Sequence, residues 1–195
     1  MEWRSYSSAP KQNTTIPNLS KIPMNSLKVF KTKTHIDSRG TFSRIFDSGN
    51  PEMPKFEVMQ SNISYNPAEG TLRGMHFQKS GPPEDKIVCL LSGSVFMVII
   101  DIRPSSSTFM QKTELNLSSP LQEAIYIPSG YATGWISTSP DTSLQYLMSA
   151  RFEDCSYSGF RFNDPSHAIN WPVEPAMMSE QDRTWPNFEA KGKSR

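Results

Sequence analysis

The 195-residue chain is poor in the two residue types that most often close disulfides or hold metals. Its two cysteines, Cys89 and Cys155, lie far apart without C-x-x-C spacing, so neither a disulfide framework nor a thiolate metal site is expected. Its three histidines, His35, His76 and His167, show neither the His-x-His nor the i, i+4 spacing of metal ligands. We therefore expect chemistry that uses no metal.

Net charge and long hydrophobic runs are lacking as well. Lys and Arg total 20 against 19 Asp and Glu, a net charge of +1 that gives no field to attract nucleic acid or anionic lipid. The most apolar stretch, residues 87–100, is broken at residues 92–94 and is shorter than the roughly 17 to 25 residues of a membrane helix, so it predicts two buried strands. Residues 1–23 contain no apolar core of a secretory signal. We expect a cytoplasmic protein with neither nucleic-acid nor membrane partners.

Three common catalytic motifs are also missing. The sequence has no G-x-S-x-G, no G-x-G-x-x-G and no G-x-x-x-x-G-K-[ST]. Serine hydrolases of the elbow type, dinucleotide enzymes and P-loop enzymes depend on these turns for a nucleophile or a phosphate cradle, so all three classes are disfavoured.

What the sequence does contain is a series of short runs rich in Val, Ile, Phe and Tyr, separated by Pro, Gly, Asn and Ser. Such spacing without an apolar heptad is typical of an all-β sandwich or barrel. The expected strands are residues 56–64, 71–78, 86–91, 95–103, 113–117, 123–127, 133–137 and 144–152. One folded domain is expected over residues 25–188, with a flexible leader at 1–24 and a charged tail at 189–195.

Polar side chains share one face of some of these strands. Gln60, Asn62 and Ser64 have the same parity, and His76 shares its parity with Gly74 and Gln78. A solvated outer face explains any single strand of this kind. Several together indicate a barrel with a polar, ligand-sized mouth.

Four residues near these strands could carry chemistry, and each also has an ordinary structural explanation. His76 is the best-placed general base, although a lone histidine in an apolar strand is more often a satisfied core residue. Tyr146 could simply pack, and Lys86 and Arg73 could be strand-flanking residues that extend to solvent. The surrounding motifs are needed to distinguish a catalytic from a structural role for these residues.

Nine motifs occur in the order found in one enzyme family. They are DSRGTF (37–42), QSNIS (60–64), GTLRGMHFQ (70–78), DKIV (85–88), VIIDIRP (98–104), YIPSGY (126–131), NDP (163–165), INWP (169–172) and SEQD (179–182). In this order they resemble the dTDP-4-dehydrorhamnose 3,5-epimerase family, and the resemblance covers about residues 26–188. The resemblance implies a cupin-like jelly-roll barrel with short peripheral helices. It also implies a homodimer that epimerises a nucleoside-diphosphate 4-keto-6-deoxyhexose in deoxysugar biosynthesis without metal or cofactor.

The resemblance also implies a role for each matched position. His76 would be the base, Asp182 its orienting partner and Tyr146 the acid on the opposite face of the sugar. Lys86 would stabilise the enolate that forms when the proton next to the C4 ketone is removed. The remaining matched positions would bind substrate, some of them across the dimer: Arg39, Phe42, Gln60, Asn62 and Arg73.

The spacing of two of these residues has a geometric consequence. Arg73 and His76 are three residues apart, so a regular strand would point them to opposite faces. If both line one cavity, a bulge or twist near Gly74 must intervene. We predict that irregularity.

Three positions depart from the family pattern and leave the ligand open. Thr133 replaces a histidine in the family block G-F-A-H-G-F, Arg44 stands where relatives often have glutamate, and Phe152 falls in a pair that is normally two tyrosines. All three are candidate substrate-binding residues. One alternative is therefore an epimerase acting at C3 or C5 alone on a CDP- or GDP-linked 4-keto sugar, and another is a non-catalytic sugar-nucleotide binder. A ketoisomerase of the same type would need an H-A-H-K-like block, which residues 75–78 lack.

Overall fold

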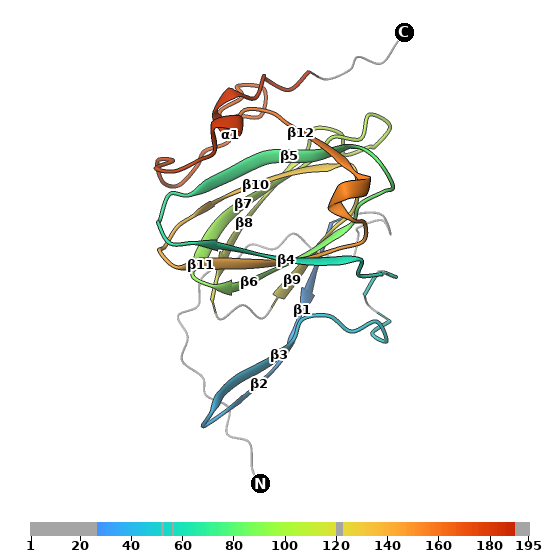
Figure 1. The fold of residues 1–195 in the computed structure, drawn as a ribbon, viewed down its shortest axis with the longest axis vertical. Helices are drawn as coiled ribbons and strands as arrows, with labels where there is room; N and C mark the ends of the chain where they lie inside the picture. The colour runs from blue at the N-terminus through green and yellow to red at the C-terminus, as the bar shows by residue number, and fades with distance from the viewer. Residues whose placement is uncertain (1–26, 52, 56, 120–122, 190–195) are drawn as a thin grey trace.

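Two antiparallel five-stranded sheets face each other and form the body of the protein (Figure 1). The computed structural model describes residues 27–51, 53–55, 57–119 and 123–189. The first sheet has the order β1 (Lys28–Lys31), β9 (Glu123–Ile127), β6 (Lys86–Ser92), β11 (Thr142–Met148) and β4 (Gln60–Asn66). The second has the order β12 (Ser156–Gly159), β5 (Leu72–Ser80), β10 (Tyr131–Ser137), β7 (Ser94–Asp101) and β8 (Lys112–Ser118). The expected all-β class is confirmed.

Strand β7 shows why the longest apolar stretch folds as it does. Val95, Met97 and Ile99 pack into the core between the two sheets. The alternate residues Phe96, Val98 and Ile100 pack on the outer side of the second sheet. Because successive side chains point to opposite faces, a strand buried on both sides must be apolar throughout. The prediction of two buried strands within residues 87–100 is confirmed by β6 and β7.

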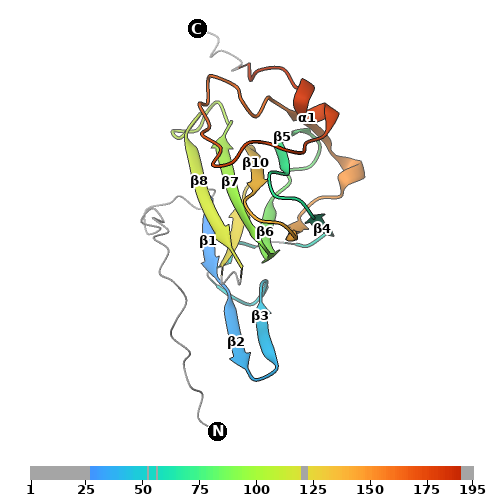
Figure 2. The same ribbon diagram turned by 90° about the vertical axis from the view of Figure 1, so that its left-hand side faces the viewer.

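The outer face of the second sheet is covered by the C-terminal part of the chain (Figure 2). Phe160, Trp171 and Phe188 pack there against Phe96 and its neighbours. This segment contains helix α1 (Glu180–Thr184), whose N-cap Ser179 accepts a hydrogen bond from the Asp182 N–H at 3.1 Å. Helix α1 and the 3-10 turn η2 (Phe152–Asp154) are the short peripheral helices that were expected.

A two-stranded hairpin extends away from the sandwich at the end opposite α1 (Figures 1 and 2). It consists of β2 (Lys33–Asp37) and β3 (Gly40–Arg44), and neither strand was expected from the sequence. Strands β1 and β12 were missed as well, because such short runs carry little apolar pattern.

Two of the expected strands differ from the structure by four residues at one end. The strand expected over 56–64 begins only at Gln60, and the strand expected over 144–152 ends at Met148. Phe152 instead opens the turn η2, because the chain leaves strand β11 of the first sheet there and crosses to β12 in the second.

The expected leader at 1–24 and residues 190–195 of the expected tail lie outside the described residues. Within the described ranges, no helix has both the length and the apolar character needed to cross a membrane.

Candidate active site

A bulge in β5 brings Arg73 and His76 to the same cavity. His76 pairs with Thr133 of β10 and Arg73 pairs with Trp135, so three steps along β5 match two along β10. Gly74, between them, has a φ of 122°. A Cβ atom added at Gly74 would lie 2.6 Å from the Cα of Gly134, so only glycine fits this close crossing. The predicted irregularity is confirmed.

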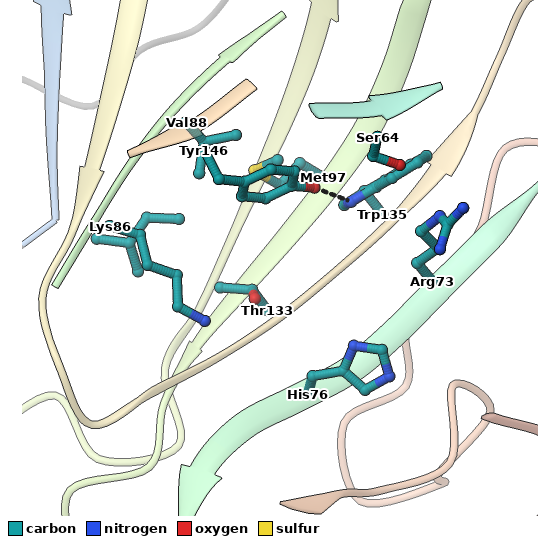
Figure 3. A pocket seen from close by; sticks show the side chains of 10 residues that line it. Ser64, Arg73, His76, Lys86, Val88, Met97, Thr133, Trp135 and Tyr146 are labelled. Atoms are coloured by element: carbon teal, nitrogen blue, oxygen red, sulfur yellow. Dashed lines mark hydrogen bonds between the residues drawn. The ribbon is translucent and has the colours of Figure 1, made fainter. Parts of the chain in front are cut away.

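The cavity lies between the two sheets and has a volume of about 230 Å³ (Figure 3). Its polar lining comes from both sides, with His76 on β5 and Tyr146 and Lys86 on the facing sheet. The complete lining is Ser64, Arg73, His76, Lys86, Val88, Met97, Ile127, Thr133, Trp135 and Tyr146. Figure 3 shows the rings of His76 and Tyr146 on opposite sides, with Thr133 between them.

A second, more open cavity of about 630 Å³ adjoins the first and shares His76, Lys86 and Tyr146 with it. Two further candidate residues, Asn62 and Phe152, line this outer cavity. Its other lining residues are Met148, Cys155, Tyr157, Ser158, Gln181 and Trp185. The two cavities together are large enough for a ligand with two distinct parts.

His76 and Asp182 form a hydrogen-bonded pair at the edge of the inner cavity. The Nε2 atom of His76 lies 2.6 Å from Oδ1 of Asp182, whose side chain is 4% exposed. The Gly74 N–H also donates to Oδ2 at 3.4 Å. Burial alone would raise the pKa of the Asp182 carboxyl, but the hydrogen bonds and the charge of His76 outweigh it and the pKa is lowered. The carboxylate is therefore ionised and holds the imidazole by Nε2.

Tyr146 faces His76 from strand β11 of the other sheet. Its hydroxyl oxygen accepts a hydrogen bond from Nε1 of Trp135 at 2.7 Å. Burial raises the pKa of Tyr146 to about 12, although the Trp135 bond and the charge of Arg73 act in the opposite direction. Because the indole can only donate, the phenol hydrogen is left for a partner in the cavity.

The two cations of the inner cavity have defined neighbours. Lys86 Nζ lies 3.3 Å from Oε1 of the buried Glu84. Arg73 donates from Nε to Asn66 Oδ1 at 3.0 Å, and its guanidinium lies 6.0 Å from the centroid of the Trp135 ring. These contacts hold two positive charges at the wall of a cavity with an apolar floor.

Four of the candidate substrate-binding residues lie apart from the lining of the two cavities. Arg39, Phe42 and Arg44 belong to the β2–β3 hairpin, where Arg39 pairs with Asp37 at 2.5 Å, Arg44 pairs with Asp47 at 3.1 Å, and Phe42 is 70% exposed. Gln60 lies near the outer cavity and accepts a hydrogen bond from the Phe152 N–H at 2.9 Å.

The chain as a whole is similar to known proteins. Residues 21–190 match the family model described as dTDP-4-dehydrorhamnose 3,5-epimerase. The chain belongs to this family. The membership identifies it as an isomerase of the epimerase type, and the sheets described above are those of the family's cupin-like jelly roll.

Individual members of the family are similar over most of their length. The chain is 34% identical to the dTDP-4-dehydrorhamnose 3,5-epimerase of Mycobacterium tuberculosis, covering 80% of this chain and 79% of that protein. It is 30% identical to the enzyme of Methanothermobacter thermautotrophicus, covering 85% and 91%.

Two solved structures with bound ligands are similar as well. The Bacillus anthracis epimerase with TDP and PPi bound superposes with a TM-score of 0.78 at 28% identity, covering 88% of this chain and 99% of that one. A 3'-monoepimerase from Streptomyces bikiniensis in complex with dTDP-quinovose gives 0.73 at 25% identity, covering 83% of each chain.

Three residues in or beside the two cavities were not found from the sequence: Trp135, Glu84 and Tyr157. Trp135 has the same strand parity as Thr133, so an alternation argument would have placed it in the cavity. Glu84 and Tyr157 carried no such signal, because Glu84 lies in a charged loop segment and Tyr157 in a four-residue strand.

Proposed function

We propose that the enzyme inverts C3, C5 or both in a dTDP-linked 4-keto-6-deoxyhexose, using His76 as the base and Tyr146 as the acid. The observation that carries this proposal is the position of these two groups on facing sheets of one cavity, with Lys86 beside them. Inversion at a carbon requires proton removal from one side of the ring and proton delivery to the other. A binder of sugar nucleotides has no need of that arrangement.

The first half of the reaction is proton abstraction. The C4 ketone acidifies the protons on C3 and C5, because the electron pair left behind is delocalised onto the carbonyl oxygen as an enolate. His76 takes the proton on Nδ1, since Nε2 is held by Asp182, and the carboxylate stabilises the imidazolium. Lys86 supplies the fixed positive charge near the enolate oxygen.

The second half is proton delivery from the opposite side. A phenol whose pKa is about 12 stays protonated at neutral pH and donates to the carbanion carbon. The Trp135 N–H stabilises the phenolate that results until solvent returns the proton. No metal or redox cofactor is needed for this sequence of proton transfers.

The remaining candidate residues divide the ligand between them. Arg73 binds the diphosphate, since a guanidinium suits phosphate oxygens, and Thr133 offers a hydroxyl to the sugar. Asn62, Gln60 and Phe152 lie at or near the outer cavity, where the nucleoside enters. We propose thymidine as the nucleoside because the relatives are named for dTDP sugars.

A homodimer completes the site in this proposal. Arg39, Phe42 and Arg44 lie on an exposed hairpin outside the cavity lining, which is consistent with a role in the site of a second copy. Ile63 and Tyr65 of β4 are 65% and 57% exposed, which also favours a partner surface. A cytoplasmic location follows from the nucleotide-sugar substrate.

A second candidate is inversion at one position only. The observation that favours it is Thr133 at the centre of the cavity, where the family motif has a histidine. A threonine hydroxyl reaches less far than an imidazole and carries no charge, so it holds the ring less firmly for two successive inversions. The similar Streptomyces bikiniensis protein is itself named a 3'-monoepimerase.

Proton exchange tests the proposal directly. The protein is incubated in deuterated water with dTDP-, CDP- and GDP-linked 4-keto-6-deoxyglucose, and NMR follows the C3 and C5 protons. We expect exchange with the dTDP sugar, no exchange with His76→Ala, and exchange with little inversion for Tyr146→Phe. Exchange at one carbon would establish the single-position reaction, and absence of exchange with every sugar would leave only the binder.

A further inference from the structure

A fully buried carboxylate lies behind the lysine of the site. The Glu84 side chain is 0% exposed, and its Oε1 is 3.3 Å from Nζ of Lys86, whose side chain is 14% exposed. Among the described residues, no hydrogen-bond donor reaches this oxygen with good geometry, so the ion pair with Lys86 is its polar contact. A buried carboxylate is costly unless it is paired, which ties the two side chains together.

The other oxygen of Glu84 is fixed by a second residue. The hydroxyl of Tyr157, from strand β12, donates to Oε2. Burial, together with the hydrogen bond to Glu84 and its charge, raises the pKa of Tyr157, so its hydroxyl remains a donor. The Glu84 N–H also donates to Gln78 Oε1 of β5 at 3.0 Å. Backbone and side chain of Glu84 are thus held by two strands of the opposite sheet.

This arrangement solves a physical problem for an enolate-stabilising lysine. A lysine ammonium sits on a flexible four-carbon stem and tends to turn toward water. Stabilisation of a developing oxyanion requires a charge that is already in place before the reaction begins. Glu84 supplies a buried anchor for the Lys86 ammonium, and the hydrogen bond from Tyr157 holds that anchor in place.

We propose that Glu84 is a positioning residue that fixes the Lys86 ammonium at the cavity wall. The proposal rests on the role given to Lys86 in the proposed function. Tyr157 extends the device to the mouth of the site, because its ring stacks on Phe152 at a centroid distance of 5.0 Å and an interplanar angle of 14°. Both rings line the outer cavity, so Tyr157 connects Glu84 to the surface over which the proposed ligand enters.

The first test is a double-mutant cycle on the exchange reaction. Glu84→Gln keeps the shape and the oxygen that accepts from Tyr157 but removes the charge. We expect the rate of C3 and C5 exchange to fall by about 10- to 100-fold, with dTDP affinity, measured by calorimetry, changed less than about twofold. In a Lys86→Met background, the same Glu84→Gln change should cost less than about twofold, because its effect acts through the lysine. An equal loss in both backgrounds would overturn the proposal.

The second test needs no substrate. In the 15N spectrum of lysine side chains, a held ammonium gives a signal that is lost when the group exchanges rapidly with water. We expect the Lys86 signal in the wild type, its loss in Glu84→Gln, and its retention in Glu114→Gln, which removes the partner of Lys112 at 2.8 Å on the surface. A Lys86 signal unaffected by Glu84→Gln would refute the anchor. Exchange absent from the wild type would instead refute the proposed function.

Tyr157→Phe provides a milder variant if Glu84→Gln does not fold. It leaves the charge of Glu84 in place and removes the hydrogen bond to Oε2. We expect a loss of exchange smaller than that of Lys86→Met and a weakened Lys86 signal. An unchanged rate together with an unchanged signal would contradict the role of Tyr157 in the anchor and, with it, the proposal.

Discussion

The hydrogen bond from Trp135 to Tyr146 offers a test of the acid that does not touch the acid itself. Trp135→Phe removes the N–H that lies 2.7 Å from the phenol oxygen and leaves an aromatic ring in a position that is 4% exposed. Proton donation turns the phenol into a phenolate, and a hydrogen bond to a charged oxygen is stronger than one to a neutral oxygen. The substitution therefore weakens the acid more than it disturbs its position.

The magnitude follows from the difference between these two bonds. A bond to a neutral group contributes about 1 kcal/mol and one to a charged group about 2 kcal/mol, so the differential loss is about 1 kcal/mol. This corresponds to about fivefold to tenfold slower proton delivery and to a Tyr146 pKa raised further above its value of about 12. The void left by the smaller ring lowers the free energy of unfolding by about 1–3 kcal/mol.

The assay follows two rates in one NMR sample in deuterated water. In the proposed mechanism, exchange reports proton removal by His76, and formation of the inverted sugar reports proton delivery by Tyr146. We expect the ratio of exchange to inversion to rise about fivefold to tenfold in Trp135→Phe. The matched control is Trp171→Phe, which removes an indole N–H bonded to the Phe162 carbonyl at 2.9 Å on the outer side of the second sheet. If both rates fall together in Trp135→Phe, or if the control changes the ratio equally, the indole acts only through packing.

Three further predictions concern the dyad and the bulge. Asp182→Asn should lower the exchange rate by about 10³- to 10⁴-fold while dTDP affinity is retained, because the amide no longer stabilises the imidazolium. Kinetics measures the exchange rate and calorimetry the affinity. A loss of exchange below tenfold would contradict the role of Asp182 as the partner of His76. The folded-state pKa of Asp182 is lowered from 3.8, so its carboxylate stabilises the fold above that pH, and this stabilisation is lost as pH falls through the folded value. The free energy of unfolding, measured with urea between pH 6 and pH 2.5, should therefore depend less on pH in Asp182→Asn than in the wild type. Gly74→Ala should lower the free energy of unfolding by about 3 kcal/mol more than Gly40→Ala. Both glycines have a φ near +125°, but only at Gly74 would an added Cβ contact the backbone of a neighbouring strand. Equal losses in thermal melts would show that the close crossing at Gly74 does not affect stability.

Local pattern predicted the central strands well and the edges poorly. The unbroken apolar run of residues 95–100 indicates a strand buried on both faces, and the structure has it there. The hairpin residues 33–44 are mostly polar and exposed, so their sequence shows no apolar pattern that would predict a strand. The bulge at Gly74 could be predicted because two side chains of opposite parity were required in one place.

Long-range placement explains what the sequence could not provide. Asp182 reaches His76 only because the C-terminal segment crosses the second sheet and contains α1, and its role was inferred from a motif rather than from geometry. The pairing of Glu84 with Tyr157 likewise joins a loop to a strand more than seventy residues away. Burial of a charge is a property of the folded chain, and a charged loop segment looks solvated until the fold is known.

The proposed acid and base lie on two facing sheets, so the hydrophobic core between the sheets takes part in placing them. Val88, Met97 and Ile127 form the apolar floor of the inner cavity and belong to the cluster that holds the sheets apart. Their combined bulk acts as a spacer that sets the gap which the sugar ring must bridge. A methylene gained or lost at these positions would change the distance between the proposed acid and base. Core volume here would therefore affect the reaction rate as well as the free energy of unfolding.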